Sequence, residues 1–349
     1  MPGWNSAALA PRWCIVAVGS AVLVSLQRAP PSLTRAHALG LAFFGYCAVS
    51  VLWSPIFVDA AQAFIKLCIL ALAFLVGFRS TDLKPLYIGF GAGMCVNSVV
   101  LIVQRLGFIE FDGVGLFFNP TLNGEAAILI LAALMTQGPW WIVIGTWPSM
   151  ILSGSRAAVA AAAAIILTYL WQNRRRGYAL LALASCILLC AVALWYGKFS
   201  YRPFERLDIW NDTLSGLTPF GRGIGSFWTT FPLYANHQNL LLSRPEHAHN
   251  DYLELTYELG IGAVLAFWLA IHLFRRAAAT ERRVFVAFAV LSLVGFPLFM
   301  PASAFLLALA AGHAARNSPE LRFIVVLRRE RMVRRSQPET WAVVNPKAS

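Results

Sequence analysis

Long apolar runs follow one another along most of this 349-residue chain, and clusters of Lys and Arg separate them. Hydrophobic residues make up 58% of the sequence and charged residues only 13%, a balance that excludes a soluble domain. An apolar α-helix of ~20 residues crosses a bilayer with its backbone polar groups satisfied internally. We therefore predict an all-α, polytopic transmembrane helix bundle of about eleven spans, within a range of roughly 10 to 12. The predicted spans cover residues 13–27, 36–53, 58–77, 86–106, 122–136, 139–152, 156–172, 178–197, 251–274, 284–300 and 303–315.

The basic clusters indicate which side of the membrane each polar stretch faces. Cytoplasmic loops are enriched in Lys and Arg, and this enrichment also accounts for the net charge of +12 without a nucleic-acid partner. The N-terminus is then external, and the first apolar run is expected to be a retained span, because Met1 to Pro11 carries no basic region. The predicted divisions are N-terminal transmembrane helices (1–197), one large external loop (198–250), C-terminal transmembrane helices (251–315) and a basic cytoplasmic tail in contact with membrane lipids (316–349).

Ionisable residues are concentrated at the point where the external loop meets a membrane helix. Two His, four carboxylates and an Arg fall within residues 244–258 of a chain that is otherwise poor in charge. Charged groups at the edge of a membrane are costly, so such a concentration indicates a functional site. Upstream in the same loop, residues 202–217 have the pattern of an amphipathic helix suited to lie along the membrane surface. Residues 219–227 then form a Gly-rich turn that would let a ligand approach the main chain.

Several short motifs, taken together and in this order, resemble the O-antigen ligase and O-antigen polymerase family. The motifs are Trp53-Ser54-Pro55, Phe118-Asn119-Pro120, Ser153-Gly154-Ser155-Arg156-Ala157, Arg206 with Trp210, Pro219-Phe220-Gly221-Arg222-Gly223-Ile224-Gly225, and His249-Asn250 followed by Gly260. The resemblance implies a membrane-embedded, GT-C-like glycosyltransferase of the bacterial inner membrane. Such an enzyme moves a glycan, with inversion, from undecaprenyl diphosphate to an acceptor sugar hydroxyl on the periplasmic side. It also implies that no metal or other cofactor takes part.

Arginines are the candidates for binding the donor diphosphate. Arg156 starts a span on the outer side, and its planar guanidinium can engage two phosphate oxygens at once and stays charged. Without the resemblance, an interfacial Arg that contacts lipid headgroups is an equal interpretation. Arg206, Arg222 and Arg244 are further candidates for substrate binding in the loop. Ion pairs with neighbouring carboxylates are the alternative for these exposed side chains.

His249 is the candidate general base, because a neutral imidazole can accept the proton of the attacking hydroxyl near neutral pH. A carboxylate such as Glu258 or Asp251 would orient the ring and stabilise the imidazolium. Asn250 is expected to fix the backbone or a sugar by hydrogen bonds. A simple helix-capping or interfacial role is the alternative for an isolated His at this position.

A metal site remains an alternative, with His247, His249 and either Glu246 or Asp251 as ligands. The spacing typical of a helical zinc site is absent, and the six Cys all lie in apolar runs, so neither disulfides nor Cys-bound metal are expected.

Three classes of function fit a polytopic membrane protein of this kind. The first is a ligase that passes the glycan to the lipid A core, or a polymerase that passes it to a growing repeat unit. The second is a transporter, which would concentrate charges in mid-span, where this chain has only Lys66 and Glu125. The third is a scaffold, which would leave the His, Arg and Gly content of the loop without a cause. The glycosyltransferase is the favoured interpretation.

Overall fold

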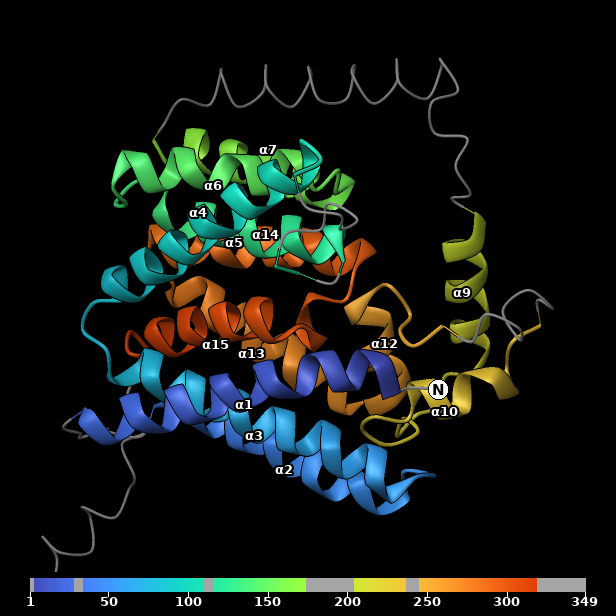
Figure 1. The fold of residues 1–349 in the computed structure, drawn as a ribbon. Coiled ribbons are helices and arrows are strands. Elements are labelled where there is room, and N and C mark those ends of the chain that lie inside the picture. Colours follow the sequence, from blue (N-terminus) through green and yellow to red (C-terminus); the bar gives the residue numbers. More distant parts are fainter. Residues whose placement is uncertain are drawn as a thin grey trace, which may run out of the picture.

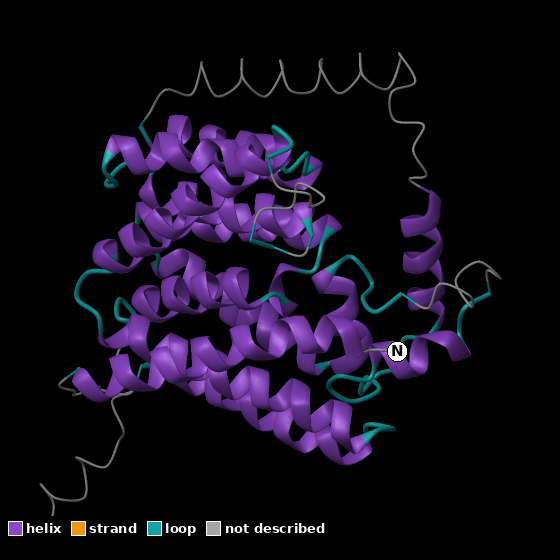
Figure 2. Ribbon diagram, viewed as in Figure 1, coloured by secondary structure: helices purple, strands orange, loops and turns teal. Residues whose placement is uncertain are grey.

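The computed structural model describes residues 3–27, 34–108, 116–117, 119–173, 204–236 and 245–318, and within them the regular elements are helices (Figures 1 and 2). This confirms the all-α prediction for the described residues, none of which forms a strand. The predicted span 178–197, Arg244 and most of the basic tail lie outside these residues. The elements in chain order are α1 (Gly3–Leu26), α2 (Arg35–Ser50), η1 (Val51–Trp53), α3 (Phe57–Arg79), α4 (Lys84–Arg105), α5 (Pro120–Leu134), α6 (Trp140–Leu152), α7 (Arg156–Gln172), α9 (Phe204–Ser215), α10 (Phe227–Thr230), η2 (Phe231–Leu233), α12 (Asp251–Leu259), α13 (Gly262–Arg276), α14 (Ala279–Val294), η3 (Pro297–Phe299) and α15 (Pro301–Ala315).

The helices have the length and composition of a membrane protein. Three segments of the described chain are long and apolar enough to cross a bilayer: Arg35–Trp53, Phe57–Arg79 and Lys84–Arg105. Shorter apolar helices occupy the ranges expected for most other spans, namely Pro11–Leu26, Thr121–Leu134, Trp140–Leu152, Arg156–Gln172 and Pro301–Ala315. The number of spans and the GT-C-like arrangement stay predictions.

One predicted helix, 251–274, is wrong, because the chain breaks after nine residues. Gly260 adopts a left-handed conformation with φ of 52°, which ends α12 before α13 starts at Gly262. The break is held from outside the helix, since the backbone N–H of Ile261 donates to the carbonyl of Pro219 at 2.8 Å. The helical pattern continues across the break in sequence, so only this contact with a distant turn reveals it.

The predicted span 284–300 is also wrong at its end, because α14 stops at Val294. Gly295 is extended, and Pro297 starts the short η3, so the chain cannot continue as one helix. Helix α14 therefore ends next to the N-terminal part of α5, and Arg206 of α9 donates a hydrogen bond to this end. Both interruptions occur where membrane helices meet the loop segments.

Helix α5 forms the centre of the bundle. Every residue from Leu122 to Leu134 is buried, and α4, α6, α7, α14 and α15 all pack against this helix. A buried polar network fixes its N-terminal half: Asn97 Nδ2 donates to Asn123 Oδ1 and to Ser149 Oγ, at 2.8 Å each. Buried hydrogen bonds of this kind favour one packing arrangement. The position of α5 is therefore set by both apolar packing and hydrogen bonds.

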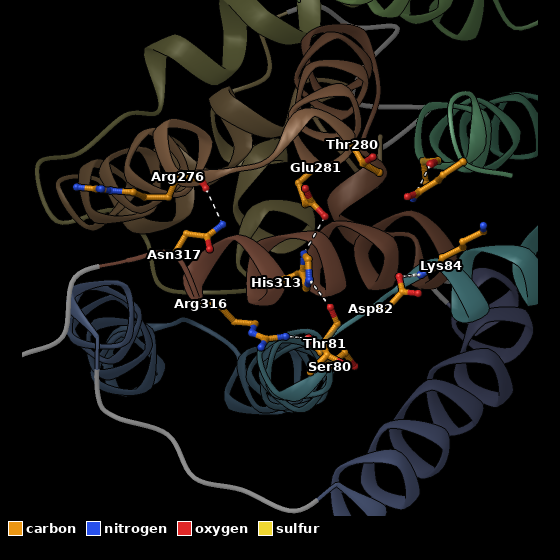
Figure 3. Close-up of polar contacts among 12 residues, drawn as sticks. Ser80, Thr81, Asp82, Lys84, Arg276, Thr280, Glu281, His313, Arg316 and Asn317 are labelled. Atoms are coloured by element: carbon orange, nitrogen blue, oxygen red, sulfur yellow. Dashed lines mark hydrogen bonds and ion pairs between the residues drawn. The ribbon is translucent and has the colours of Figure 1, made fainter.

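A second polar cluster joins the ends of α3, α13, α14 and α15 away from α12 (Figure 3). His313 Nδ1 lies 2.9 Å from Glu281 Oε1, and Arg316 donates to the carbonyl of Ser80. Asn317 Nδ2 donates to the carbonyl of Arg276 at 3.1 Å. These contacts satisfy carbonyl groups at the C-terminal ends of helices. The cluster closes the end of the bundle that was predicted to face the cytoplasm.

The predicted amphipathic helix is confirmed as α9, and part of its apolar surface is buried by neighbouring segments while Leu207 and Leu214 stay exposed. Ile209 is buried with Phe227, Phe231 and Tyr257 in a small core that joins α9 to α10 and α12. Trp210 Nε1 donates to the carbonyl of Ala248 at 2.9 Å. Helix α9 therefore positions the histidine-containing segment, and Figure 1 shows it standing beside the bundle near α10 and α12.

Candidate functional site

The histidine-containing segment enters α12 through a constrained turn. Asn250 is the N-cap of this helix, and its side-chain oxygen accepts the N–H of Leu253 at 3.1 Å. His249 has a positive φ of 52°, the sole such case among the non-glycine residues that the structure describes. Left-handed geometry is strained for a residue with a Cβ, and such strain concentrates at functional sites. Asn250 was predicted to bind either the backbone or a sugar, and its side-chain oxygen binds the backbone.

Three carboxylates on one face of α12 hold the surrounding segments in place. Asp251, Glu254 and Glu258 follow the i, i+3, i+7 spacing of a single helix face and are 2%, 1% and 3% exposed. Buried carboxylates are tolerated only when hydrogen bonds compensate for the lost water. Each of the three binds a different part of the chain, so this face organises the site.

Glu254 fixes the histidine-containing segment itself. Its Oε1 lies 2.8 Å from His247 Nδ1, and its Oε2 accepts the N–H of Ala248 at 2.8 Å. The His247 ring is also stacked on Phe296, with centroids 4.5 Å apart. His247 is therefore held by α12 and by the segment after α14. Glu254 was not among the residues predicted from the sequence, although its helical spacing from Asp251 and Glu258 was visible there.

Glu258 fixes the Gly-rich turn. Its Oε2 accepts the N–H of Gly225 at 2.9 Å, and its Oε1 accepts the N–H of Phe227 at 3.0 Å. The N–H of Gly223 also donates to the carbonyl of Glu258 at 2.8 Å. Both carboxylate oxygens thus accept main-chain N–H groups of the Gly-rich turn, and the roles of Glu258 in binding substrate and in orienting the His249 ring stay predictions.

Asp251 connects α12 to the end of α14. Its Oδ2 accepts Ser292 Oγ–H at 2.8 Å and the N–H of Leu298 at 3.1 Å. Its other oxygen, Oδ1, is buried without a hydrogen-bond partner. Asp251 therefore fixes the η3 segment, whose neighbour Phe296 contacts both histidines.

His249 lies against Phe296, edge to face at a centroid distance of 5.0 Å. Burial, together with the charges of Arg206 and His247, lowers the pKa of His249 to about 4. The imidazole is therefore neutral at physiological pH and can accept a proton. The proximity of Arg206 also places a cation beside the candidate base.

Arg206 and Arg156 reach this region from two separate helices. Arg206 extends from α9, and its Nη1 donates to the carbonyl of Val294 at 2.7 Å. Burial lowers the pKa of Arg206, the charge of Glu125 raises it, and the charge of Arg156 lowers it, so these three groups lie within electrostatic reach. Arg156 is the first residue of α7, after the N-cap Ser155 and a left-handed Gly154. Arg156, Arg206 and His249 thus belong to one region.

Arg222, by contrast, serves the loop structure. Its Nε donates to the carbonyl of Gly216 at 2.8 Å, and its guanidinium lies 4.0 Å from the ring centroid of Tyr234. The guanidinium thus connects the Gly-rich turn to the end of α9, and the expected role of Arg222 in substrate binding stays a prediction. Arg244 lies outside the described residues, and its predicted role stays untested.

The comparison with protein families selects this same part of the chain. Residues 141–268 match the family model for O-antigen ligase. The O-antigen ligase resemblance is thereby confirmed over this segment. It runs from α6 to α13 and contains Arg156, Arg206 and His249. A search of curated proteins finds no match.

Two of the residues considered as metal ligands, His247 and Asp251, are held by other groups in the described structure. In the part of the chain that the structure describes, no three His, Cys, Asp or Glu side chains are grouped as metal ligands. Of the four residues considered, His247 is engaged by Glu254 and Asp251 by Ser292 and Leu298. The charge of Arg206 acts on His249 and that of Arg156 acts on Arg206, so cationic groups that suit an anion lie in this region.

Proposed function

We propose that this protein is an O-antigen ligase-type glycosyltransferase that uses a glycan linked to undecaprenyl diphosphate. The acceptor is a sugar hydroxyl of the lipid A core, at the periplasmic face of the inner membrane. The observation that carries the proposal is that Arg206 lies within electrostatic reach of both His249 and Arg156, in the segment that matches the ligase family. A base beside an anion-binding pair is the minimum that transfer from a diphosphate requires.

The chemistry follows from these groups. The acceptor oxygen attacks the anomeric carbon while His249 takes its proton, and the bond from that carbon to the diphosphate oxygen breaks with its electron pair staying on the diphosphate. Arg156 and Arg206 stabilise the charge that develops on this leaving group, through hydrogen bonds that shorten and strengthen with charge. Attack on the face opposite the leaving group inverts the anomeric configuration.

An apolar pocket beside the site suits the isoprenoid chain of the donor. It has a volume of about 280 Å³ and is bounded by Ile15 of α1, Leu122 of α5, and Met300 and Phe305 near and in α15. Met300 packs with Phe296 and Phe299, the residues that contact the histidines, so the pocket and the site share a wall. Arg12, whose Nη2 donates to the carbonyl of Leu116, also lies in the lining. A lipid chain gains ~0.8 kcal/mol for each CH₂ that it buries.

The decisive test is transfer by the purified protein with lipid-linked donor and core acceptor. We expect His249→Ala to lose ~100- to 10,000-fold in rate, as is typical when a general base is removed, and still to bind the donor. EDTA should have no effect. Near-normal transfer by His249→Ala, or EDTA-sensitive transfer that a divalent ion restores, would contradict the mechanism.

A deletion strain separates ligase from polymerase. Loss of all long chains from the lipid A core, with accumulation of lipid-linked polymer, identifies a ligase. If the deletion strain instead makes lipid A core that carries a single repeat unit, the protein is a polymerase that joins repeat units on the same carrier.

A further inference from the structure

Glu125 is the one charged residue in the α5 sequence, and it lies in the middle of the bundle. Its side chain is 1% exposed, on a helix whose described side chains are buried all around. An ionisable group in such a place is costly and marks a functional position by default. Each of the three carboxylates of α12 takes part in two hydrogen bonds. The Oε2 of Glu125 is buried without a hydrogen-bond partner, as is the Oδ1 of Asp251.

The carboxylate of Glu125 meets the guanidinium of Arg206 at one peptide group. Its Oε1 lies against Gly295, where an added Cβ would come within 2.7 Å of this oxygen. The preceding residue, Val294, supplies the carbonyl that accepts Arg206 Nη1 at 2.7 Å. The open end of α14 therefore brings together a buried carboxylate from α5 and an exposed guanidinium from α9. The missing side chain at position 295 leaves the space that the carboxylate occupies.

Electrostatics agree with this geometry. Glu125 is the largest favourable charge acting on Arg206, and it opposes the effects of burial and of Arg156 on the pKa of that guanidinium. Arg206 would otherwise be an exposed side chain with many rotamers and a like charge nearby. A buried carboxylate within electrostatic reach of this guanidinium favours one orientation.

We propose that Glu125 is a positioning residue, which holds the Arg206 guanidinium over the site so that it faces the donor diphosphate. The role of the diphosphate rests on the proposed function, whereas the pairing of Glu125 with Arg206 does not. Through this pair, the innermost helix of the bundle sets the direction of a side chain that belongs to the external loop. Gly295 is part of the same arrangement, because any side chain at this position would displace the Glu125 carboxylate.

The pairing is tested on the purified full-length protein, without donor, by the rate at which phenylglyoxal modifies Arg206, followed by mass spectrometry. We expect Glu125→Gln to raise this rate about tenfold, and Glu125→Asp to keep it closer to the wild-type rate because the charge remains. Glu281→Gln is the matched control, since it also neutralises a buried carboxylate, at the opposite end of the bundle. An unchanged rate in Glu125→Gln, or an equal rise in Glu281→Gln, would overturn the proposal.

A second variant covers the case in which Glu125→Gln does not fold. Gly295→Ala keeps the charge but pushes the carboxylate away, so it should also raise the reactivity of Arg206. Unchanged reactivity there would refute the pairing on its own.

Transfer kinetics test the positioning role. We expect Glu125→Gln to raise the KM for the lipid-linked donor about tenfold, which is about 1.4 kcal/mol, and to have no further effect in an Arg206→Ala background. Additive effects would mean that Glu125 acts on something other than Arg206. If the wild-type protein transfers no glycan, the proposed function fails, but the phenylglyoxal result still decides the pairing.

Discussion

The left-handed backbone conformation of His249 leads to a prediction about two variants that differ in stability but not in activity. His249→Ala and His249→Gly both remove the imidazole and its contact with Phe296, so these losses cancel when the two variants are compared. What differs is the backbone at φ of 52°, where a Cβ costs about 1–2 kcal/mol and Gly is free of that cost. The greater conformational freedom of Gly in the unfolded chain lowers the stability of the Gly variant and offsets roughly 0.5–1 kcal/mol of this difference. His249→Gly should therefore be more stable than His249→Ala by about 0.5–1 kcal/mol.

The measurement is the free energy of unfolding of each purified variant in mixed micelles, with transfer activity measured in parallel. Neither variant should transfer glycan, because the base is absent from both. Ala235→Gly is a useful control, because Ala235 has no positive φ and the change should cost about 0.5–1 kcal/mol, the opposite sign. If His249→Gly is as unstable as His249→Ala, or less stable, the strained turn does not exist and the inferred geometry of the base is wrong.

Three further predictions address the other parts of the site. Arg156→Lys should lose most transfer activity, because a point charge replaces a bidentate fork; an active Lys variant in the same assay would reduce Arg156 to a generic positive charge. The folded-state pKa of His249 is lowered to about 4, so the base stays neutral above that pH. The acid limb of the pH–rate profile should therefore lie well below the ordinary His pKa of ~6.5. An acid limb at ~6.5 would contradict the burial of His249. The same shift implies that the stability contributed by neutral His249 is complete above about 6.5 and declines as pH falls towards 4. Glu254→Ala should destabilise the protein by ~2–4 kcal/mol, because the N–H of Ala248 and the His247 ring both lose a buried partner, whereas Glu254→Gln should cost less; equal stability of both variants and wild type in micelle unfolding would show that these bonds are not formed.

The sequence by itself determined where most helices lie. Apolar runs predicted α2 to α7 and α15 closely, because a helix in an apolar medium satisfies its own backbone and depends little on its neighbours. The first helix was predicted from residue 13, but α1 begins at Gly3. The alternation of charged and apolar residues likewise predicted α9, and the order of short motifs pointed to the O-antigen ligase family. His249, Arg206 and Arg156 were also identified at this level, although from the resemblance as much as from their chemistry.

Only the tertiary structure decided what each polar group binds. Glu258, Asn250 and Arg222 are of the right chemical types for substrate binding, yet their hydrogen bonds go to the chain itself. The break at Gly260 was also hidden, since it depends on a partner far away in the sequence, whereas Pro297 is a local signal of the break at Gly295.

The clearest case is Glu125, which the sequence presented as an isolated charge in an apolar helix. Its meaning comes from α14, which ends beside it, and from α9, which brings Arg206 to the same peptide group. Hydrophobic patterning is local, and it fixes which faces are buried. The partner of a buried charge is chosen by the packing of segments that are distant in the chain, so it exists only once the fold is complete.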